Sequence, residues 1–175
     1  TDEYREALIG NLEQVEKLIA LARSLLTLTK VTGDRPPLQL APLELEPLLQ
    51  ELIIELKLLA DDRRISLALD VVPVPTISAD AQWLKQALIN LLDNSLKYTP
   101  PGGSVTVRLR RSDESLEIAV RDTGPGIESE HVPFLFDRFY RADKARARES
   151  GGTGLGLAIV KGIVEAHGGT VSVDT

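Results

Sequence analysis

Residues 80–122 read DAQWLKQALINLLDNSLKYTPPGGSVTVRLRRSDESLEIAVRD, and they contain the transitions that decide the fold. Asp80 is a typical N-cap residue for a helix that extends to about Tyr98, where the prolines and glycines of residues 100–103 end it. Apolar and polar residues then alternate over 105–110 and again over 116–121. This alternation predicts two antiparallel strands joined by a turn at residues 112–114.

The sequence on both sides of this stretch predicts further helices and strands. Toward the N-terminus we expect a short strand at 38–40, a helix at 44–60 with Pro47 in its first turn, and a strand at 65–71. Toward the C-terminus we expect an irregular stretch over 128–153, a helix at 154–167 and the start of a strand over 168–173. The order predicts an α+β fold, a two-layer α/β sandwich whose mixed, mainly antiparallel sheet is covered by about three helices.

The first 31 residues predict one long amphipathic helix that precedes this sandwich. Apolar residues recur at alternating steps of four and three, at Leu8, Leu12, Val15, Ile19, Ala22 and Leu26. This is a heptad seam, and Leu18 and Leu25 widen it toward the pattern of a helical hairpin or four-helix bundle. The alternative is a lone helix packed on its own domain. Gly33 and the two prolines that follow place a boundary between a unit at 1–33 and a unit at 34–175.

Composition excludes several classes of function. The 175 residues carry a net charge of −6, which argues against nucleic-acid binding. The chain has no cysteine and two histidines, so a bound metal would need oxygen ligands. No apolar run approaches the about 20 residues of a membrane span, so we expect no membrane contact and a cytoplasmic location. There is no methionine, even at position 1, which suggests a piece cut from a longer protein.

The helix that begins after Asp80 carries two stripes. Its apolar stripe is expected in the core and consists of Leu84, Leu88, Leu91 and Ser95. A second stripe carries Asn90, Asn94 and Lys97. Asparagine is unfavourable inside a helix, and its amide oxygen is a hard ligand for Mg²⁺, while Lys97 could meet phosphate. The alternative is an ordinary polar surface.

Two glycine-containing segments follow. Residues 122–127, DTGPGI, end a strand with a carboxylate that can accept a hydrogen bond from an exocyclic amine, although a simple turn explains the same residues. Residues 151–157, GGTGLGL, lead into a helix and predict an anion site at its N-terminus, with a flexible hinge as the alternative. They match neither a Walker A loop nor a dinucleotide fingerprint. Residues 137–149 contain five basic side chains, typical of a lid over phosphates or of a solvated loop.

In this order the segments resemble the catalytic ATP-binding domain of sensor histidine kinases, in the GHKL ATPase superfamily. The resemblance rests on four motifs: QALINLLDNSLKYT at 86–99 (N box), DTGPGI at 122–127 (G1 box), FDRFYR at 136–141 (F box) and GTGLGL at 152–157 (G2 box). The heptad helix is similar to the second helix of the hairpin through which these kinases dimerise and accept phosphate.

The resemblance implies ATP and Mg²⁺ as cofactors and assigns roles to particular residues. The implied catalytic residues are Asn90, Lys97, Arg138 and Arg141, with no choice made between the two arginines. The implied metal ligands are Asn90 and Asn94. The implied nucleotide-binding residues are Asn94, Lys97, Tyr98, Asp122, Gly124, Gly126, Ile127, Gly152, Thr153, Gly154, Leu155 and Gly156.

The implied partners are a histidine-bearing helix of the same kinase, acting in cis or in trans, a response regulator, and a second copy in a homodimer. The phosphoacceptor histidine of such a hairpin has no counterpart here, because His131 and His167 are interpreted as structural or solvated. Two alternatives remain. An ATP-hydrolysing clamp carries Glu at the position of Asn90, an amide that cannot take a proton at neutral pH. A non-catalytic nucleotide-sensing or dimerisation module would need no base.

Overall fold

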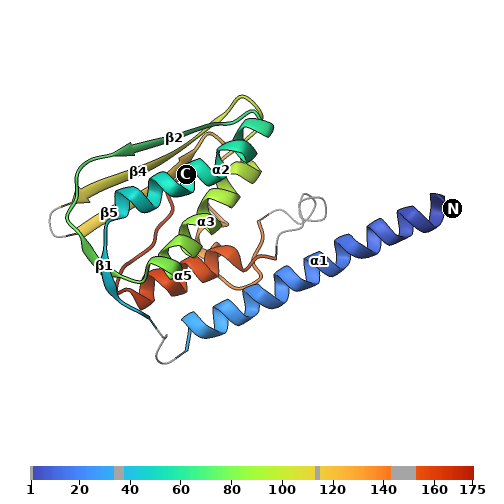
Figure 1. The fold of residues 1–175 in the computed structure, drawn as a ribbon, viewed down its shortest axis with the longest axis horizontal. Coiled ribbons are helices and arrows are strands. Elements are labelled where there is room, and N and C mark those ends of the chain that lie inside the picture. Colours follow the sequence, from blue (N-terminus) through green and yellow to red (C-terminus); the bar gives the residue numbers. More distant parts are fainter. Residues whose placement is uncertain (1, 34–37, 113–114, 143–152) are drawn as a thin grey trace.

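A three-stranded mixed sheet forms the centre of the computed structural model, which describes residues 2–33, 38–112, 115–142 and 153–175. The sheet consists of β2 (Ser66–Val71), β4 (Ser104–Ser112) and β5 (Ser115–Asp122), with β4 in the middle (Figure 1). β4 is parallel to β2 and antiparallel to β5, which confirms the expected hairpin, although residues 113 and 114 of its turn lie outside the described residues.

Helices α2 (Leu45–Asp62) and α3 (Ala81–Tyr98) cover one face of this sheet. The alternation in β4 decides which face is covered, because Val105, Val107 and Leu109 are fully buried while Arg108 between them is exposed. α2 contributes Leu49 and Leu52 to the same core. The α+β sandwich expected from the sequence is therefore confirmed.

A second, two-stranded sheet was not expected. β1 (Ala41–Leu43) pairs antiparallel with β3 (Ile77–Ala79). β1 begins directly after the strand predicted at 38–40, so the prediction placed this strand too early in the sequence. β3 was missed because it is only three residues long and follows Pro73 and Pro75, which interrupt any alternation.

Helix α5 (Gly156–Ala166) packs beside α3 and forms a second core with it. The helix begins two residues after the predicted position. The strand expected over 168–173 is wrong: these residues pair with no strand among the described residues. A backbone without a neighbouring strand cannot form a ladder, and Val171 instead packs against the second core.

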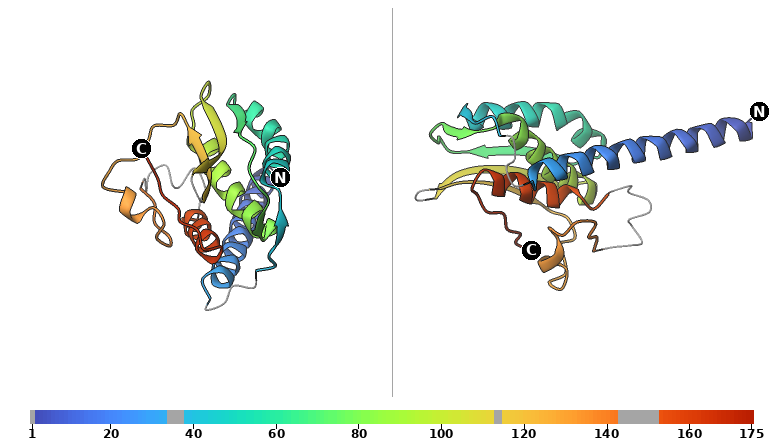
Figure 2. Two further views of the ribbon diagram at one scale, coloured as in Figure 1. Left: turned by 90° about the vertical axis from the view of Figure 1, so that its left-hand side faces the viewer. Right: turned by 90° about the horizontal axis from the view of Figure 1, so that it is seen from below.

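Helix α1 (Asp2–Val31) extends away from the sandwich, and its N-terminal part projects beyond the rest of the molecule (Figures 1 and 2). The heptad positions Leu8, Leu12 and Val15 are exposed, whereas Leu28 and Val31 near the C-terminal end are buried in the second core. Only the end of α1 therefore packs on the domain. The predicted boundary lies at residues 33 and 34, the second of which is outside the described residues, and it stays a prediction. No helix among the described residues combines the length and hydrophobicity needed to cross a membrane.

Asp80 joins three parts of the chain. Its Oδ1 accepts hydrogen bonds from the N–H groups of Gln82 and Trp83, which confirms the predicted N-cap of α3, and its Oδ2 accepts one from Gln39 N–H. Its own N–H donates to Nε2 of His167, at the end of α5. Burial raises the pKa of the Asp80 carboxyl, but the three backbone donors outweigh burial and hold the pKa below its usual value.

Candidate nucleotide-binding site

The helix α3 directs Asn90 toward the start of α5. Asn90 Nδ2 donates a hydrogen bond to the carbonyl oxygen of Gly156 at 3.4 Å, and a Cβ on Gly156 would lie 3.9 Å from the Asn90 side chain. Asn94 follows one turn later and, like Asn90, is half-buried. Asn90 and Gly156, 66 residues apart in the sequence, are therefore in contact, and Asn94 lies on the same helix one turn from Asn90.

Lys97 lies at the last turn of the same helix in a positively charged environment. Burial lowers the pKa of its ammonium group, and the nearby guanidinium groups of Arg141 and Arg63 lower it further, against the opposing effect of Asp93. The structure thus brings Arg141, from the segment predicted as a lid, into the neighbourhood of Lys97. Tyr98 is exposed, and its ring lies 5.3 Å from Lys97 Nζ.

Asp122 ends β5 with both carboxylate oxygens engaged. Oδ1 accepts a hydrogen bond from Gly124 N–H at 2.9 Å, and Oδ2 accepts one from the hydroxyl of Ser95 at 3.0 Å. Gly124 is needed here, since a Cβ would lie 2.8 Å from Asp122 Oδ1 and 3.3 Å from the Tyr98 carbonyl oxygen. Ser95 was assigned to the core from the sequence; it is buried, but its hydroxyl belongs to this site.

Gly154 connects the glycine loop to the lid segment. Its φ of +70° lies in the left-handed region, and a Cβ would meet the Phe139 carbonyl carbon at 2.9 Å and the Tyr140 carbonyl oxygen at 3.0 Å. Its own carbonyl oxygen accepts a hydrogen bond from Phe139 N–H at 2.9 Å. Phe139 itself has φ of +64°, so both sides of this contact adopt uncommon backbone conformations.

The other predicted site residues take varied positions. Thr153 Oγ1 accepts a hydrogen bond from Leu155 N–H, and the Leu155 side chain is fully buried in the second core. Gly126 has φ of +75° and open space around it, and Ile127 is half-buried. Gly152 lies outside the described residues, as do residues 143–149 of the predicted lid. Arg138 is placed at the end of α1, where Nη2 donates to Thr32 Oγ1.

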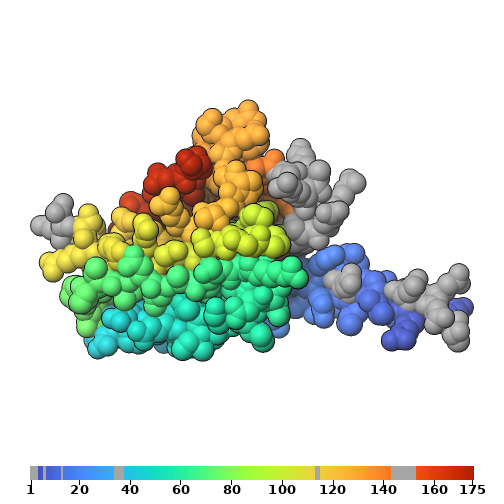
Figure 3. All heavy atoms as spheres, turned by 90° about the horizontal axis from the view of Figure 1, so that it is seen from above, coloured from blue at the N-terminus to red at the C-terminus, as the bar shows by residue number. Residues whose placement is uncertain are grey.

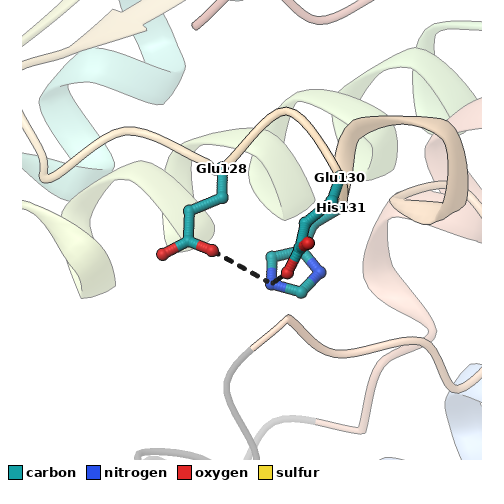
Figure 4. A group of neighbouring side chains, drawn as sticks. All are labelled: Glu128, Glu130 and His131. Carbon is teal, nitrogen blue, oxygen red and sulfur yellow. Dashed lines mark ion pairs between the residues drawn. The ribbon is translucent and has the colours of Figure 1, made fainter.

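The segment after β5 protrudes from the body of the molecule beside the C-terminal residues (Figure 3). It contains the short 3-10 helix η1 (Val132–Phe134) and a group of three titratable residues, Glu128, Glu130 and His131 (Figure 4). His131 Nε2 lies 3.9 Å from a Glu128 oxygen and 3.7 Å from a Glu130 oxygen, while Nδ1 lies 2.8 Å from the Tyr140 hydroxyl. The two carboxylates are largely exposed, and neither asparagine belongs to this group.

Two shallow depressions lie elsewhere on the surface. Residues 44–50 and 73–76 contribute to the first, and residues 39–43 and 79–82 to the second. Neither contains a residue of the site predicted from the sequence.

The fold and this arrangement define an α+β nucleotide-binding domain of the ATPase type. The carboxylate at the end of β5 and the glycine at the start of α5 are both hydrogen-bonded to α3, the helix that carries the asparagine pair and Lys97. The family described as histidine kinase-, DNA gyrase B- and HSP90-like ATPase matches residues 79–175, and the chain belongs to this family.

Sensor histidine kinases are among the relatives that match nearly the whole chain. Sensor histidine kinase CusS of Escherichia coli O157:H7 is 37% identical over 171 residues, which are 98% of this chain and 35% of CusS. Sensor protein IrlS of Burkholderia pseudomallei is 33% identical over 99% of this chain and 37% of its own length. The crystal structure of full-length ShkA in complex with AMPPNP superimposes with a TM-score of 0.86 at 32% identity, covering 100% of this chain and 36% of ShkA. This chain therefore spans little more than a third of each of these proteins.

Proposed function

We propose that this chain is the ATP-binding catalytic part of a two-component sensor histidine kinase, which transfers the γ-phosphoryl group of Mg-ATP to a histidine other than His131 and His167. The observation that carries the proposal is that α3 contacts both nucleotide-binding segments, through Asn90 to Gly156 and through Ser95 to Asp122. His167 is not a suitable acceptor, because both ring nitrogens already have partners, the Asp80 N–H and the Ile163 carbonyl oxygen.

The adenine end of the nucleotide is assigned to the end of β5. Asp122 would accept a hydrogen bond from the exocyclic amine, since an ionised carboxylate has more acceptor positions than the two used by Ser95 and Gly124. Gly126, with open space around it, leaves the backbone accessible to a flat ring, while Gly124 allows the backbone to pass close to Asp122 and Tyr98. Ile127 and the exposed Tyr98 would line the nucleoside.

The phosphate end is assigned to the other end of the site. Lys97 would meet the phosphate chain, together with the backbone amides of residues 152–156 and the Thr153 hydroxyl. The N-terminus of α5 supports an anion there, because its first N–H groups have no partner within the helix.

The side chains of Asn90 and Asn94 fit Mg²⁺. Asn90 uses its Nδ2 on Gly156, which leaves its amide oxygen for a cation, and amide oxygens are hard ligands of the kind that Mg²⁺ accepts. When bound, Mg²⁺ would neutralise charge on the phosphates. The chain's own residues hold the nucleotide and orient the γ-phosphoryl group.

Two observations support a choice between the two arginines for the phosphoryl group. Arg141 lies close enough to Lys97 to depress its pKa, whereas Arg138 is bonded to Thr32 at the end of α1. We therefore assign the phosphate contact to Arg141 and a contact with α1 to Arg138. A cation next to the transferring group stabilises the charge of the transition state.

The proposed partners follow from the same assignment. A histidine-bearing helix would pack against the exposed heptad seam of α1, and the same seam would pair two copies in a homodimer. A response regulator would take the phosphoryl group from the histidine, and the reaction is placed in the cytoplasm. The hydrolysing clamp is disfavoured, because Asn90 stands where a base would be needed to activate water.

Calorimetric titration with ADP and with a non-hydrolysable ATP analogue, with and without Mg²⁺, tests the proposal. We expect one saturable site, weaker binding without Mg²⁺ and strongly weakened binding in Asp122→Asn. A parallel assay of inorganic phosphate released from ATP should show no turnover. Unchanged affinity in Asp122→Asn would refute the assignment of the adenine end, and steady phosphate release would favour the hydrolysing clamp.

A further inference from the structure

Ser95 occupies an unusual position for a polar residue. It lies in the apolar stripe of α3 with 7% of its surface exposed, between the buried Leu92 and Leu96. Serine in a helix interior is less favourable than alanine by a few tenths of a kcal/mol. A buried hydroxyl in the core stripe therefore needs a partner, and its partner is Oδ2 of Asp122 at 3.0 Å.

The direction of this hydrogen bond is determined by chemistry. An ionised carboxylate only accepts, so the Ser95 hydroxyl must donate its proton to Asp122. The second bond to the carboxylate, from Gly124 N–H, comes from a residue only two positions along the chain. Such a local turn holds one oxygen, and the bond from Ser95 holds the other from a different element of the fold.

The two donors together fix the plane of the carboxylate. With one donor on each oxygen, rotation of the Asp122 side chain would break at least one bond, and the remaining acceptor positions point in set directions. The helix that supplies Ser95 also carries Asn90, Asn94 and Lys97. The acceptor for the base is therefore held in register with the groups assigned to the phosphates.

We propose that Ser95 is a positioning residue for purine selection: its hydroxyl holds Asp122 in the orientation that accepts the 6-amino group of adenine and disfavours the 6-carbonyl oxygen of an oxopurine. This inference rests on the proposed function and names the residue that sharpens its specificity. A carboxylate that is free to rotate could turn away from the 6-carbonyl oxygen of an oxopurine. A carboxylate held in place accepts a hydrogen bond from a 6-amino group and repels a 6-carbonyl oxygen.

The chain offers a matched control in Thr99. It lies one turn after Ser95, is 5% exposed, and its hydroxyl has no hydrogen-bond partner among the described residues. Thr99→Val removes a buried hydroxyl from the same end of the helix without touching Asp122. Ser95→Cys is a second variant of the test position, since it keeps the volume nearly unchanged but donates a weaker hydrogen bond.

The experiment measures ADP and inosine diphosphate affinities by calorimetry for the wild type, Ser95→Ala, Ser95→Cys, Thr99→Val, Asp122→Asn and the Ser95→Ala, Asp122→Asn double variant, with thermal unfolding as a check on folding. We expect Ser95→Ala to weaken ADP binding about fivefold to tenfold, as for loss of one charge-assisted hydrogen bond. Inosine diphosphate binding should be unchanged or stronger, because the freed carboxylate can turn away from the 6-carbonyl oxygen. Ser95→Cys should lie between, Thr99→Val should match the wild type, and Ser95→Ala should add nothing to Asp122→Asn.

Each other result overturns a specific statement. If Ser95→Ala weakens the binding of both nucleotides equally, the role of Ser95 is merely structural. If Ser95→Ala leaves the ADP affinity unchanged while Asp122→Asn lowers it, the role of Ser95 is refuted and the assignment of Asp122 to the pocket stands. A wild type that binds neither nucleotide would refute the proposed function itself, and this inference with it.

Discussion

Replacement of Gly154 by alanine tests whether the glycine loop and the lid segment form one unit. Gly154 has φ of +70°, and an added Cβ would lie 2.9 Å from the carbonyl carbon of Phe139 and 3.0 Å from its Cα. These neighbours are backbone atoms, so no side chain can rotate away. The alanine must either push residues 139–140 off the loop or distort the start of α5.

The expected cost has two parts. A non-glycine residue in the left-handed region costs about 1–2 kcal/mol. Forcing a methyl group into a closely packed contact adds about 1–3 kcal/mol. Gly168→Ala separates the two, because Gly168 lies just after the other end of α5 with φ of +75° and no atom within 4 Å of the position a Cβ would take. Gly168→Ala should therefore lower the free energy of unfolding only by the first part, whereas Gly154→Ala should lower it by about 2–5 kcal/mol.

Urea denaturation and amide hydrogen exchange together measure this difference. If the contact is retained, the free energy of unfolding of Gly154→Ala falls below that of Gly168→Ala. If the lid detaches instead, the Phe139 amide, which donates to the Gly154 carbonyl oxygen, loses its protection while global stability changes less. Either outcome should be accompanied by weaker ADP binding in Gly154→Ala alone. Equal stability, equal Phe139 protection and equal ADP affinity in the two variants would refute the coupling of loop and lid.

Three further perturbations have definite expected results. Asp80→Ala removes the cap of α3 and the bond to Gln39 and should cost about 1–3 kcal/mol in urea denaturation. The pKa of Asp80 is lower in the folded than in the unfolded chain, so its contribution to the stability of the fold should be complete above the unfolded pKa and should disappear as the pH falls through the folded pKa. Asp80→Ala should lack this acid-dependent loss of stability. Gly162→Leu should separate α1 from α5, because even a Cβ at Gly162 would lie 2.8 Å from Val31 Cγ2. The fluorescence of Trp83, the only tryptophan, should then shift to the red, since Trp83 packs against the same core. An unchanged emission spectrum would contradict the packing of α1 on this face. Because the pKa of Lys97 is lowered and the phosphates need its protonated form, ADP affinity should begin to fall at a lower pH than it would with an ordinary lysine. Lys97→Arg should remove this pH dependence, since arginine stays protonated. The same pH profile in Lys97→Arg would exclude Lys97 as its source.

Local chemistry could be predicted well from the sequence. The Asp80 cap was predictable because an N-cap side chain bonds to N–H groups two and three residues away, and alternation gave the buried face of β4 because side chains of a strand alternate between faces. Both depend only on neighbouring residues.

Pairing between distant segments could not be predicted in the same way. β3 exists because β1 lies alongside it, although its own sequence is short and flanked by prolines. Residues 168–173 have the composition of a strand but lack a neighbour among the described residues, and the pattern alone cannot report that. The two arginines of the predicted lid were equivalent on spacing. Only the folded chain separates Arg138, at Thr32, from Arg141, near Lys97.

Ser95 shows where helical periodicity is sufficient and where it is not. The period correctly placed Ser95 in the buried stripe of α3, and burial would normally classify it as core. The signal that was available is its type, because a hydroxyl inside an apolar stripe must find an acceptor or leave a polar group unsatisfied. The sequence could not name that acceptor, since Asp122 is 27 residues away and reaches Ser95 only through the pairing of β4 with β5 and the packing of α3 on the sheet. A polar residue that breaks an apolar stripe next to candidate ligand-binding residues is therefore itself a candidate for the site, and the Ser95→Ala titration decides whether that rule holds here.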